Sequence, residues 1–451
     1  MRTAIVLFTR DLRVHDQPAL AAAVAGFDRV VPLFVFDREV LARFGAPNRV
    51  AFLLDALGDL DASLRARGGA LVLREGNVVD ETMRVAGDAR ATAVFVSEDV
   101  SAYAQARERG LRAACEEVGL ELNVLPGVTV IPPGDLAPAG ADCYRVFTPY
   151  WRRWRLAPRR AVVRAPREIA LPARLARGRL PALAGLVRGA PSPELPRGGE
   201  SEGRRRMTRW LARGLSGYDR LHDDLAADGT SRLGAYLHFG CLSPLDLAER
   251  ASGREGAEPF VRQLCWRDFY AQLLAARPEI SHADFRPRGH RWRDDAGALA
   301  AWKEGRTGYP IVDAGMRQLA REGFMHNRAR LLTGSFLAKD LYLDWRLGAA
   351  HYAGLLVDGD VASNSGNWQW VAGTGVDTRP NRVFNPISQA RRFDPSGDYV
   401  RRYVPELAGI EGSAVHEPWK LAQPPRGYPE PIVDHAEAVA RLRARKAYSG
   451  T

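Results

Sequence analysis

Short apolar runs alternate with helical patterns throughout residues 1–128 of this 451-residue chain. The apolar runs occupy five ranges: Ala4–Phe8, Val30–Phe36, Ala70–Leu73, Ala93–Val96 and Glu121–Leu125. Because these runs are mostly apolar, they predict strands that are buried on both faces, as in a parallel sheet covered by helices. We therefore predict an N-terminal Rossmann-like α/β domain with a doubly wound parallel sheet.

The segments between the predicted strands carry helix signals but no dinucleotide fingerprint. Arg49–Arg67 is the clearest helix, and Gly68-Gly69 end it. The loop after the first strand reads Phe8-Thr9-Arg10-Asp11-Leu12-Arg13-Val14-His15-Asp16 and lacks the pattern GxGxxG. A standard dinucleotide site is therefore not expected there.

The remainder of the chain divides into a connector and a helical domain. Residues 129–203 are rich in Pro, Ala, Arg and Gly, which predicts a surface connector with some helix near Pro149–Leu156. From 204 to 451 the periodicity is helical. The predicted helices are Leu245–Ala251 with Ser243 as N-cap, Glu258–Ala276, Ile311–Glu322 closed by Gly323, Asn327–Leu341, and Asp434–Lys446 with Asp434 as N-cap.

Charge and cysteine content narrow the class of protein. The formal net charge of +11 favours a polyanionic partner such as nucleic acid. Only four of the 64 basic residues are lysines, however, so a coding bias towards arginine explains the charge equally well. The four cysteines form no CxxC pair or metal-ligand cluster, which is typical of a reducing cytosol. No signal peptide and no apolar run of about 18 residues is visible, so we expect no membrane span.

One polar stretch, Asp358 to Trp370, has a mixture of residues that buried cores seldom use. It reads DGDVASNSGNWQW, and it follows Met325-His326-Asn327-Arg328-Ala329-Arg330. Buried carboxylates and amides need partners, because each costs a few kcal/mol when left unsatisfied. The stretch therefore predicts the wall of a site for a flat, polar ligand.

Two further patterns suit ligands but are also common in ordinary folds. Gly229-Thr230-Ser231-Arg232-Leu233-Gly234 offers hydroxyls, backbone N–H groups and a cation to phosphate oxygens, although similar helix starts are frequent. The spacing of Gln263, Trp266 and Tyr270 places all three on one helix face, which suits stacking on a base. An amphipathic helix with an aromatic stripe explains the same spacing.

Together these segments resemble the DNA photolyase/cryptochrome family, and most closely its class I cyclobutane-pyrimidine-dimer (CPD) photolyases of actinobacterial type. The resemblance covers nearly the whole chain. The segments that carry it are Arg10–Arg13, Asp228–Leu233, Trp266–Tyr270, Thr307–Asp313, Met325–Arg328, Asp344–Arg346 and Asp358–Trp370. It implies an antenna-binding α/β domain at 1–128, a connector at 129–203 and an all-α, FAD-binding and DNA-binding catalytic domain at 204–451.

The resemblance also implies a non-covalent FAD that is active in its reduced form. Residues on one side would hold its phosphates and ribityl chain: Tyr218, Thr230, Ser231, Arg232, Leu233 and Gly234. Arg330, Asp358 and Asp360 would line the other side, with Asp358 paired to Arg330. Asn364 would face the flavin N5, where a neutral amide does not oppose an anionic reduced flavin.

By the same resemblance, Trp266 and Trp370 would line the pocket for a flipped-out dimer, with Asn327 and Gln263 donating hydrogen bonds to it. Arg267, Arg328 and Gln389 would grip the nearby DNA backbone. Electrons that reduce FAD would pass along three indoles, Trp368, Trp345 and Trp292, while Trp302 would be structural or a side branch. No metal site is expected.

The chain departs from the family pattern at four places. Gln263 stands where class I dimer photolyases usually carry glutamate; it can donate a hydrogen bond but cannot transfer a proton. Glutamine there also occurs in (6-4) photolyases and animal cryptochromes, whereas Asn327 stands where (6-4) enzymes carry histidine. Leu331 replaces a methionine of similar volume, Gly234 replaces a serine, and Arg379-Pro380-Asn381-Arg382 replaces a more aromatic segment.

We therefore predict light-dependent repair of pyrimidine dimers in UV-damaged DNA by a monomeric cytoplasmic, nucleoid-associated lyase. A (6-4) photolyase and a cryptochrome photoreceptor without repair are the alternatives. A second, antenna chromophore would bind the α/β domain near Phe36, Asp37 and Asp99. An 8-hydroxy-5-deazaflavin is favoured, and methenyltetrahydrofolate is the alternative.

Overall fold

A computed structural model describes residues 1–376, 379 and 381–448. These residues form two compact units. Unit 1 comprises Met1–Pro191, Pro196–Ser216 and Ser231–Pro278, and unit 2 comprises Ser192–Leu195, Gly217–Thr230 and Glu279–Thr451. The predicted domain boundaries at 128/129 and 203/204 stay a prediction.

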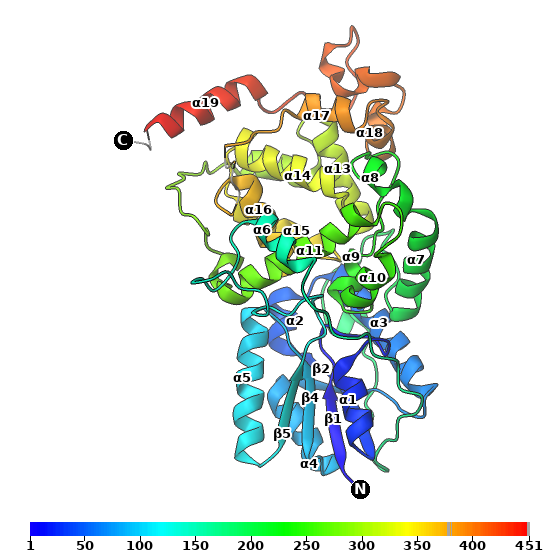
Figure 1. The fold of residues 1–451 in the computed structure, drawn as a ribbon. Helices are drawn as coiled ribbons and strands as arrows, with labels where there is room; N and C mark the ends of the chain where they lie inside the picture. The colour runs from blue at the N-terminus through cyan, green and yellow to red at the C-terminus, as the bar shows by residue number, and fades with distance from the viewer. Residues whose placement is uncertain (377–378, 380, 449–451) are drawn as a thin grey trace. The chain divides into compact units, whose positions relative to one another are not determined.

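Unit 1 is built on a five-stranded parallel sheet with the order β3-β2-β1-β4-β5. Its strands are β1 (Thr3–Leu7), β2 (Arg29–Asp37), β3 (Val72–Gly76), β4 (Ala93–Ser97) and β5 (Glu121–Leu125). Figure 1 shows β1, β4 and β5 side by side at the blue end of the chain. All five predicted strands are present, although β3 begins two residues later than expected.

Helices cover both faces of this sheet, because successive residues of each strand point to opposite sides. Ile5 and Leu7 of β1 pack into one apolar core with residues of α4 (Val78–Ala89) and α5 (Ala102–Glu117). Ala4 and Val6 are equally buried and face the other way, where α1 (Pro18–Gly26) packs on the strands. The doubly wound α/β fold is confirmed.

The rest of unit 1 is helical or irregular. Its remaining helices are α2 (Arg38–Phe44), α3 (Pro47–Arg65), α6 (Phe147–Trp154), α7 (Glu200–Arg213), α9 (Gly234–His238), α10 (Pro244–Ala251) and α11 (Ala257–Ala276). The Ser243 hydroxyl accepts a hydrogen bond from the Asp246 N–H (3.1 Å), so the predicted N-cap of α10 is confirmed. Short 3-10 helices in the two units lie at Leu183–Gly185, Leu215–Gly217, Pro278–Ser281, Pro405–Leu407, Gly412–His416 and Pro418–Lys420.

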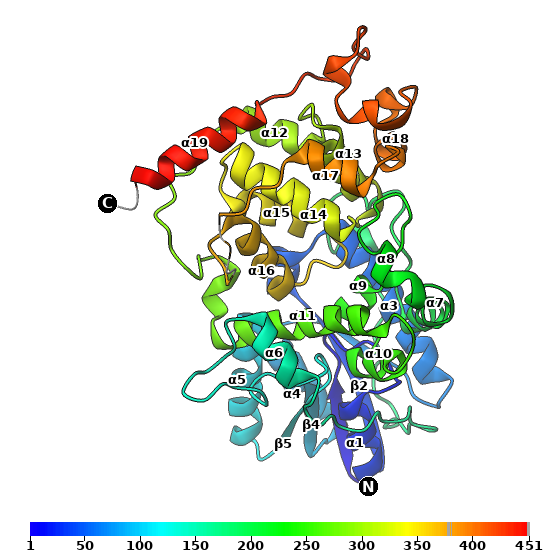
Figure 2. The same cartoon turned by 45° about the horizontal axis from the view of Figure 1, so that its top comes forward.

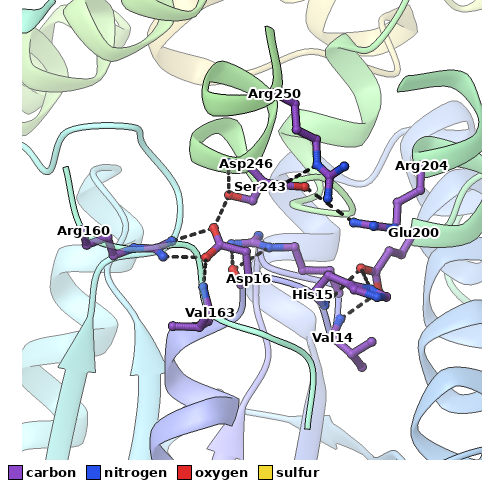
Figure 3. A network of polar contacts seen from close by, with 11 residues as sticks. Val14, His15, Asp16, Arg160, Val163, Glu200, Arg204, Ser243, Asp246 and Arg250 are labelled. Carbon is purple, nitrogen blue, oxygen red and sulfur yellow. Dashed lines mark hydrogen bonds and ion pairs between the residues drawn. The ribbon is translucent and has the colours of Figure 1, made fainter. Parts of the chain in front are cut away.

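A buried polar network fixes the loop that follows β1 (Figure 3). The Asp16 carboxylate accepts hydrogen bonds from the Arg160 guanidinium (2.5 and 2.8 Å), from the Val163 N–H (2.9 Å) and from the Ser243 hydroxyl. Burial alone would raise the pKa of Asp16, but the hydrogen bonds from Arg160 and Ser243 lower it below the ordinary value. The loop is therefore held by segments that lie far away in the sequence.

The same loop is attached to α7 through Glu200. Its carboxylate accepts hydrogen bonds from the Val14 N–H (2.8 Å), the His15 N–H (3.1 Å) and, at 2.7 Å, from the His15 imidazole (Figure 3). Arg13 donates to the backbone carbonyls of Asp16, Gly127 and Gly240. These charged residues therefore bind other parts of unit 1 and stabilise its fold.

Unit 2 is helical. Its helices are α8 (Tyr218–Leu221), α12 (Ala296–Glu304), α13 (Pro310–Glu322), α14 (Asn327–Ser335), α15 (Trp345–Leu355), α16 (Val361–Ala372), α17 (Pro386–Phe393), α18 (Asp398–Tyr403) and α19 (His435–Tyr448). Figure 2 shows α14, α15 and α16 side by side, and their apolar residues meet in one core. The helix predicted at 327–341 is continuous only to Ser335 and then widens into a π-helical turn, Phe336–Asp340.

Candidate functional site

A cavity in unit 2 lies between α14 and the start of α16. The empty space between its walls, part of which is open to solvent, amounts to about 500 Å³. Six predicted site residues line it: Asn327, Arg330, Asp358, Asp360, Asn364 and Trp368. Its apolar lining includes Leu331, Tyr352, Leu356 and Val371.

Asp358 places an unsatisfied acceptor in this wall. Its Oδ2 accepts a hydrogen bond from the Arg330 guanidinium at 2.9 Å, which is the predicted ion pair. Arg330 also donates to the Met325 carbonyl at 2.8 Å, which fixes its direction. The Asp358 Oδ1 is buried and has no hydrogen-bond partner among the described residues. Such an atom costs about 1–3 kcal/mol until a ligand donor meets it.

The polar residues of α16 are positioned by the helix start itself. The Asp360 carboxylate caps the helix by accepting from the Ser363 N–H (2.9 Å). The Asn364 amide donates to the Ala349 carbonyl of α15 (3.1 Å), which holds this neutral group in the cavity wall. The Trp368 Nε1 is buried without a hydrogen-bond partner among the described residues. An acceptor, an amide and an indole thus follow one another along the cavity.

The tryptophan side chains continue from the cavity into the core. The Trp368 ring lies 4.9 Å from the Tyr352 ring and 6.1 Å from the Trp302 ring, measured between centroids. Gly348 lets α15 approach Trp368 closely, because a Cβ there would meet the Trp368 Cη2 at 2.2 Å. Trp345 begins the same helix, and its indole N–H donates to Asp284 at 2.9 Å.

Trp292 is brought to this end of α15 by backbone pairing. An isolated parallel bridge joins Arg293 to Leu343, and the Arg293 N–H donates to the Tyr342 carbonyl at 2.9 Å. Trp292 precedes Arg293 directly, and Trp345 follows Leu343 by two residues. The segments carrying the second and third predicted electron-transfer residues therefore lie side by side.

Several predicted FAD residues do not line the cavity. In unit 2, burial raises the pKa of Tyr218, and nearby Asp223 adds to this shift. The Thr230 hydroxyl is buried and has no partner among the described residues. In unit 1, the Ser231 hydroxyl accepts from the Leu233 N–H at 3.3 Å, and α9 begins at Gly234. Arg232 adopts a left-handed backbone with φ of 51°.

The arginines predicted to bind DNA are engaged by the protein. Arg328 donates to the Asp223 carboxylate at 2.5 Å, and its guanidinium lies 4.2 Å from the Phe393 ring centroid. Arg267 donates to the carbonyls of Val128 (2.5 Å) and Leu237 (3.3 Å). These partners lie far away in the sequence, so no local pattern could have found them.

The predicted substrate residues differ in exposure. Gln263 is exposed on α11, Trp266 is half-buried and Tyr270 of the same predicted face is buried. Phe147 of α6 stacks on the Trp266 indole with centroids 3.6 Å apart and ring planes 3° apart. One face of this indole is therefore covered by the protein. Three predicted residues in unit 2 are also accessible: Asn327 begins α14, Trp370 is half-buried on α16, and Gln389 is half-buried on α17.

The predicted antenna residues lie at the carboxyl ends of two strands in unit 1: Phe36 and Asp37 are the last residues of β2, and Asp99 comes shortly after β4. The Tyr103 hydroxyl of α5 donates to the Asp37 carboxylate at 2.6 Å, and Asp99 pairs with Arg10 at 3.2 Å. Burial raises the pKa of neighbouring Glu98 to about 7, and Glu108, Asp135 and Asp99 raise it further through their negative charges. Phe36 contacts Phe34 with ring centroids 5.1 Å apart.

The described residues contain no group of three or more His, Cys, Asp and Glu side chains that could hold a metal ion. No helix in the described part of the chain is long and apolar enough to cross a membrane. The unsatisfied carboxylate oxygen, neutral amide and flanking indole of the unit 2 cavity instead suit a flat, polar ligand of the flavin class.

Comparison with known proteins agrees with this assignment. Residues 4–169 match the DNA photolyase family model, and residues 260–448 match the model of the FAD binding domain of DNA photolyase. The deoxyribodipyrimidine photo-lyase of Streptomyces griseus is 54% identical over 457 residues, which cover 99% of each chain. The chain belongs to the DNA photolyase family.

Two solved structures resemble this chain over its whole length. A bacterial class III photolyase from Agrobacterium tumefaciens has a TM-score of 0.93 and 32% identity, covering 100% of this chain and 98% of that one. An archaeal photolyase from Sulfolobus tokodaii, solved with two FAD molecules, has a TM-score of 0.88 and 32% identity. That alignment covers 99% of this chain and 100% of the archaeal one.

Proposed function

We propose that this protein is a light-dependent lyase that repairs cyclobutane pyrimidine dimers in DNA. The observation that carries the proposal is the cavity walled by Asp358, Asn364 and Trp368, which lies within the matched FAD-binding domain. Reduced FAD held there would supply, under near-UV or blue light, the electron that splits the dimer ring and is returned afterwards. The protein supplies binding, orientation and electrostatic tuning.

In the cavity, Asp358 presents its unsatisfied Oδ1 to a donor on the ligand, while Arg330 holds Oδ2 at 2.9 Å. Asn364 offers a neutral amide, held by its hydrogen bond to α15, where a carboxylate would repel an anionic ring. Asp360 stays with the backbone of α16 and keeps the helix start rigid. Tyr218 and residues 230–234 serve the phosphates and the ribityl chain.

The dimer enters as a flipped-out lesion, since damaged and poorly stacked bases cost less to extrude. Trp266 and Trp370 provide stacking surfaces, and Asn327 and Gln263 donate hydrogen bonds to pyrimidine carbonyls. Gln263 acts without proton transfer, because an amide has no acidic proton near neutral pH. Gln389 contacts the DNA backbone in this arrangement.

The net charge of +11 favours approach to DNA. Arg328 binds DNA by sharing its guanidinium between Asp223 and a phosphate. Arg267 keeps its carbonyl partners, and its positive charge attracts the phosphates of the DNA strand. We expect a monomer in the cytoplasm, associated with the nucleoid.

Trp368, Trp345 and Trp292 provide the path for electrons that restore the reduced cofactor. Trp368 lines the cavity, α15 passes beneath it at Gly348, and the Arg293–Leu343 bridge brings Trp292 to the start of that helix. Indole side chains on these neighbouring segments suit electron transfer from Trp292, which is half-buried, to the interior.

We also propose an antenna chromophore, an 8-hydroxy-5-deazaflavin, held near Phe36, Asp37 and Asp99. The Tyr103–Asp37 and Arg10–Asp99 contacts place polar groups at the carboxyl ends of the strands, where open α/β sheets bind ligands. Methenyltetrahydrofolate is the alternative, and the absorption spectrum of chromophores released from the native protein distinguishes the two.

The repair proposal is tested with purified, FAD-loaded, chemically reduced protein and an oligonucleotide that carries one thymine dimer. We expect light to restore normal thymines, whereas the same mixture in the dark remains unchanged. A parallel reaction uses an oligonucleotide with a (6-4) lesion, because (6-4) enzymes also have glutamine at the position of Gln263. Repair of the (6-4) lesion alone would overturn the lesion assignment, and repair of neither lesion would overturn the enzymatic function.

A further inference from the structure

The positive charge of this protein is concentrated in one segment. Residues 145–197 contain 13 arginines, two glutamates and neither lysine nor aspartate, which gives a net charge of +11. The whole chain has 64 basic and 53 acidic residues, also a net charge of +11, so the residues outside this segment contain 51 of each. A coding bias would raise arginine throughout the chain, and it does not explain an excess that is confined to one segment.

Most arginines of this segment are exposed and lack an acidic partner. Arg159 and Arg160 are the exceptions, since they are half-buried and bind carboxylates of unit 1 at 2.7 and 2.5 Å. The other eleven are exposed, and none of them forms an ion pair with a residue that the structure describes. Arg267 and Arg328, which were predicted to bind DNA, are instead engaged by acceptors of the protein. The segment therefore presents cations that the fold itself does not use.

One part of the segment, residues 164–179, is fixed to the sheet of unit 1, and we call it the basic connector. Four hydrogen bonds hold its backbone: from the Arg67 guanidinium to the Pro166 carbonyl (3.0 Å), from the Ile169 N–H to the Arg67 carbonyl (2.7 Å), from the Val30 N–H to the Ala170 carbonyl (2.8 Å) and from the Leu73 N–H to the Arg177 carbonyl (2.7 Å). Val30 begins β2 after Arg29, and Leu73 belongs to the edge strand β3. The basic connector is therefore an ordered cover for this edge of the sheet.

The points of attachment set the size of the basic surface. Leu73 pairs with Phe34, which follows Val30 by four residues, so Val30 and Leu73 are about 13 Å apart along the strands. B-DNA carries one phosphate per ~1.7 Å of its axis, so this length of duplex offers on the order of eight phosphates. The exposed arginines of the basic connector are Arg164, Arg167, Arg174, Arg177 and Arg179. Their number and spacing suit the backbone of one duplex.

The composition of the basic connector favours duplex DNA over other anionic partners. A guanidinium matches two phosphate oxygens with its parallel N–H groups. Single strands are bound by stacking of bases on aromatic side chains, and residues 155–197 contain no Phe, Tyr or Trp. Membrane surfaces are bound by amphipathic helices, whereas the described chain between α6 and α7 has only the 3-10 helix Leu183–Gly185. Phosphates on the outside of a duplex need neither feature.

We propose that the basic connector is a second DNA-binding surface on unit 1, which holds the backbone of undamaged duplex. Contacts to phosphates carry no sequence information, so this surface adds affinity for any duplex and has no preference for a lesion. The inference goes beyond the proposed function, because this binding needs neither flavin nor light. Its consequence is that the protein remains associated with intact DNA and reaches a lesion along the duplex.

The test is binding of the full-length, FAD-loaded protein in the dark to a short undamaged duplex, measured over a range of salt concentrations. The double variant Arg167→Gln with Arg179→Gln removes two exposed arginines of the basic connector. Each phosphate contact contributes about 0.9 to the slope of log K against log salt, so the slope should fall by about two. The affinity at low salt should fall by about tenfold or more.

Matched controls separate the position of the charge from its amount. Arg109→Gln with Arg112→Gln removes two exposed arginines from α5, which packs on β5 at the opposite edge of the sheet, and it should keep the wild-type slope. Arg167→Lys with Arg179→Lys should also keep the slope, because an ammonium still binds phosphate. Equal slopes in the two glutamine variants overturn the proposal. Loss of binding to phosphatidylglycerol vesicles but not to duplex in the connector variant also overturns it, because the surface would then belong to a membrane.

Repair is measured separately, with chemically reduced protein and a saturating single-stranded oligonucleotide that carries a thymine dimer. The connector variant should repair this substrate at the wild-type rate, because the substrate has no duplex backbone. Wild-type repair together with an unchanged duplex slope refutes the second DNA-binding surface alone. Absence of repair in the wild type refutes the proposed function, and the slopes on undamaged duplex still decide whether the basic connector binds DNA.

Discussion

Gly348 on α15 lies directly against the ring of Trp368, and its replacement by alanine is the sharpest test of the packing around the cavity. The new Cβ would be 2.2 Å from the Trp368 Cη2 and 2.6 Å from the Leu337 Cδ2. Ordinary van der Waals contact begins at 3.4 Å, so the new Cβ and the Trp368 ring, 2.2 Å apart, would have to separate by a further 1.2 Å. Leu337 is 0% exposed and Trp368 is 3% exposed, so neither side chain has space to move.

The magnitude follows from two opposing effects. Overpacking of a filled core costs about 1–3 kcal/mol. Alanine recovers about 0.5–1 kcal/mol over glycine within a helix. We expect Gly348→Ala to lower the free energy of unfolding by about 1–2 kcal/mol. Because the strain falls on Trp368, photoreduction of bound FAD should also slow.

Gly354 of the same helix provides the matched control. A Cβ there meets nothing within 4 Å, so Gly354→Ala should leave stability unchanged or raise it by about 0.5 kcal/mol. Urea denaturation of both variants measures the difference, and flash photolysis measures the electron transfer. If Gly348→Ala is as stable as Gly354→Ala and reduces FAD at the wild-type rate, the close approach of α15 to Trp368 is wrong.

Three other predictions concern charged and polar groups. The pKa of Glu98 is raised from its ordinary 4.5 to about 7. The folded protein therefore keeps a proton that the unfolded chain has lost between these pH values, and the free energy of unfolding falls as pH rises from 4.5 to 7. Glu98→Gln should therefore raise the free energy of unfolding at pH 8 by about 1–2 kcal/mol, after allowance for partial exposure, and leave it unchanged near pH 4. Equal urea midpoints of the variant and the wild type at pH 8 would contradict this prediction. Asp358→Asn should weaken FAD binding by about 10- to 100-fold, since a charged acceptor is lost, and titration of apoprotein with FAD measures it. Asn364→Asp should lower the two-electron midpoint potential of the flavin by about 30 mV or more, because a carboxylate repels the anionic reduced ring. An unchanged potential in spectroelectrochemistry would contradict the proposed location of Asn364 beside the flavin ring.

The sequence predicted the elements whose signals are local. Ser243 and Asp434 cap their helices as expected, the latter by accepting the Glu437 N–H at 2.8 Å. β3 was placed too early because it is an edge strand that continues through Arg74 and Glu75, which apolar patterning excludes. The π turn after Ser335 has no signal in periodicity.

The candidate site was foreseeable where its residues are neighbours in sequence. Asp358, Asp360, Asn364 and Trp368 share one helix and its N-terminal loop, so one polar stretch reveals them together. Contacts between distant segments were not foreseeable. The pairing of Arg328 with Asp223 is one such contact, since it depends on tertiary packing over 105 residues.

The buried network around Asp16 has a consequence for synthesis of the protein. Asp16 and its partner Ser243 are separated by 227 residues. At about 5–20 residues per second, ribosomes need roughly 10–45 s to complete that interval. Until then the Asp16 carboxylate lacks one of its buried hydrogen-bond donors. The first unit can therefore close only late in translation, and a nascent chain that ends before Ser243 is a natural substrate for chaperones.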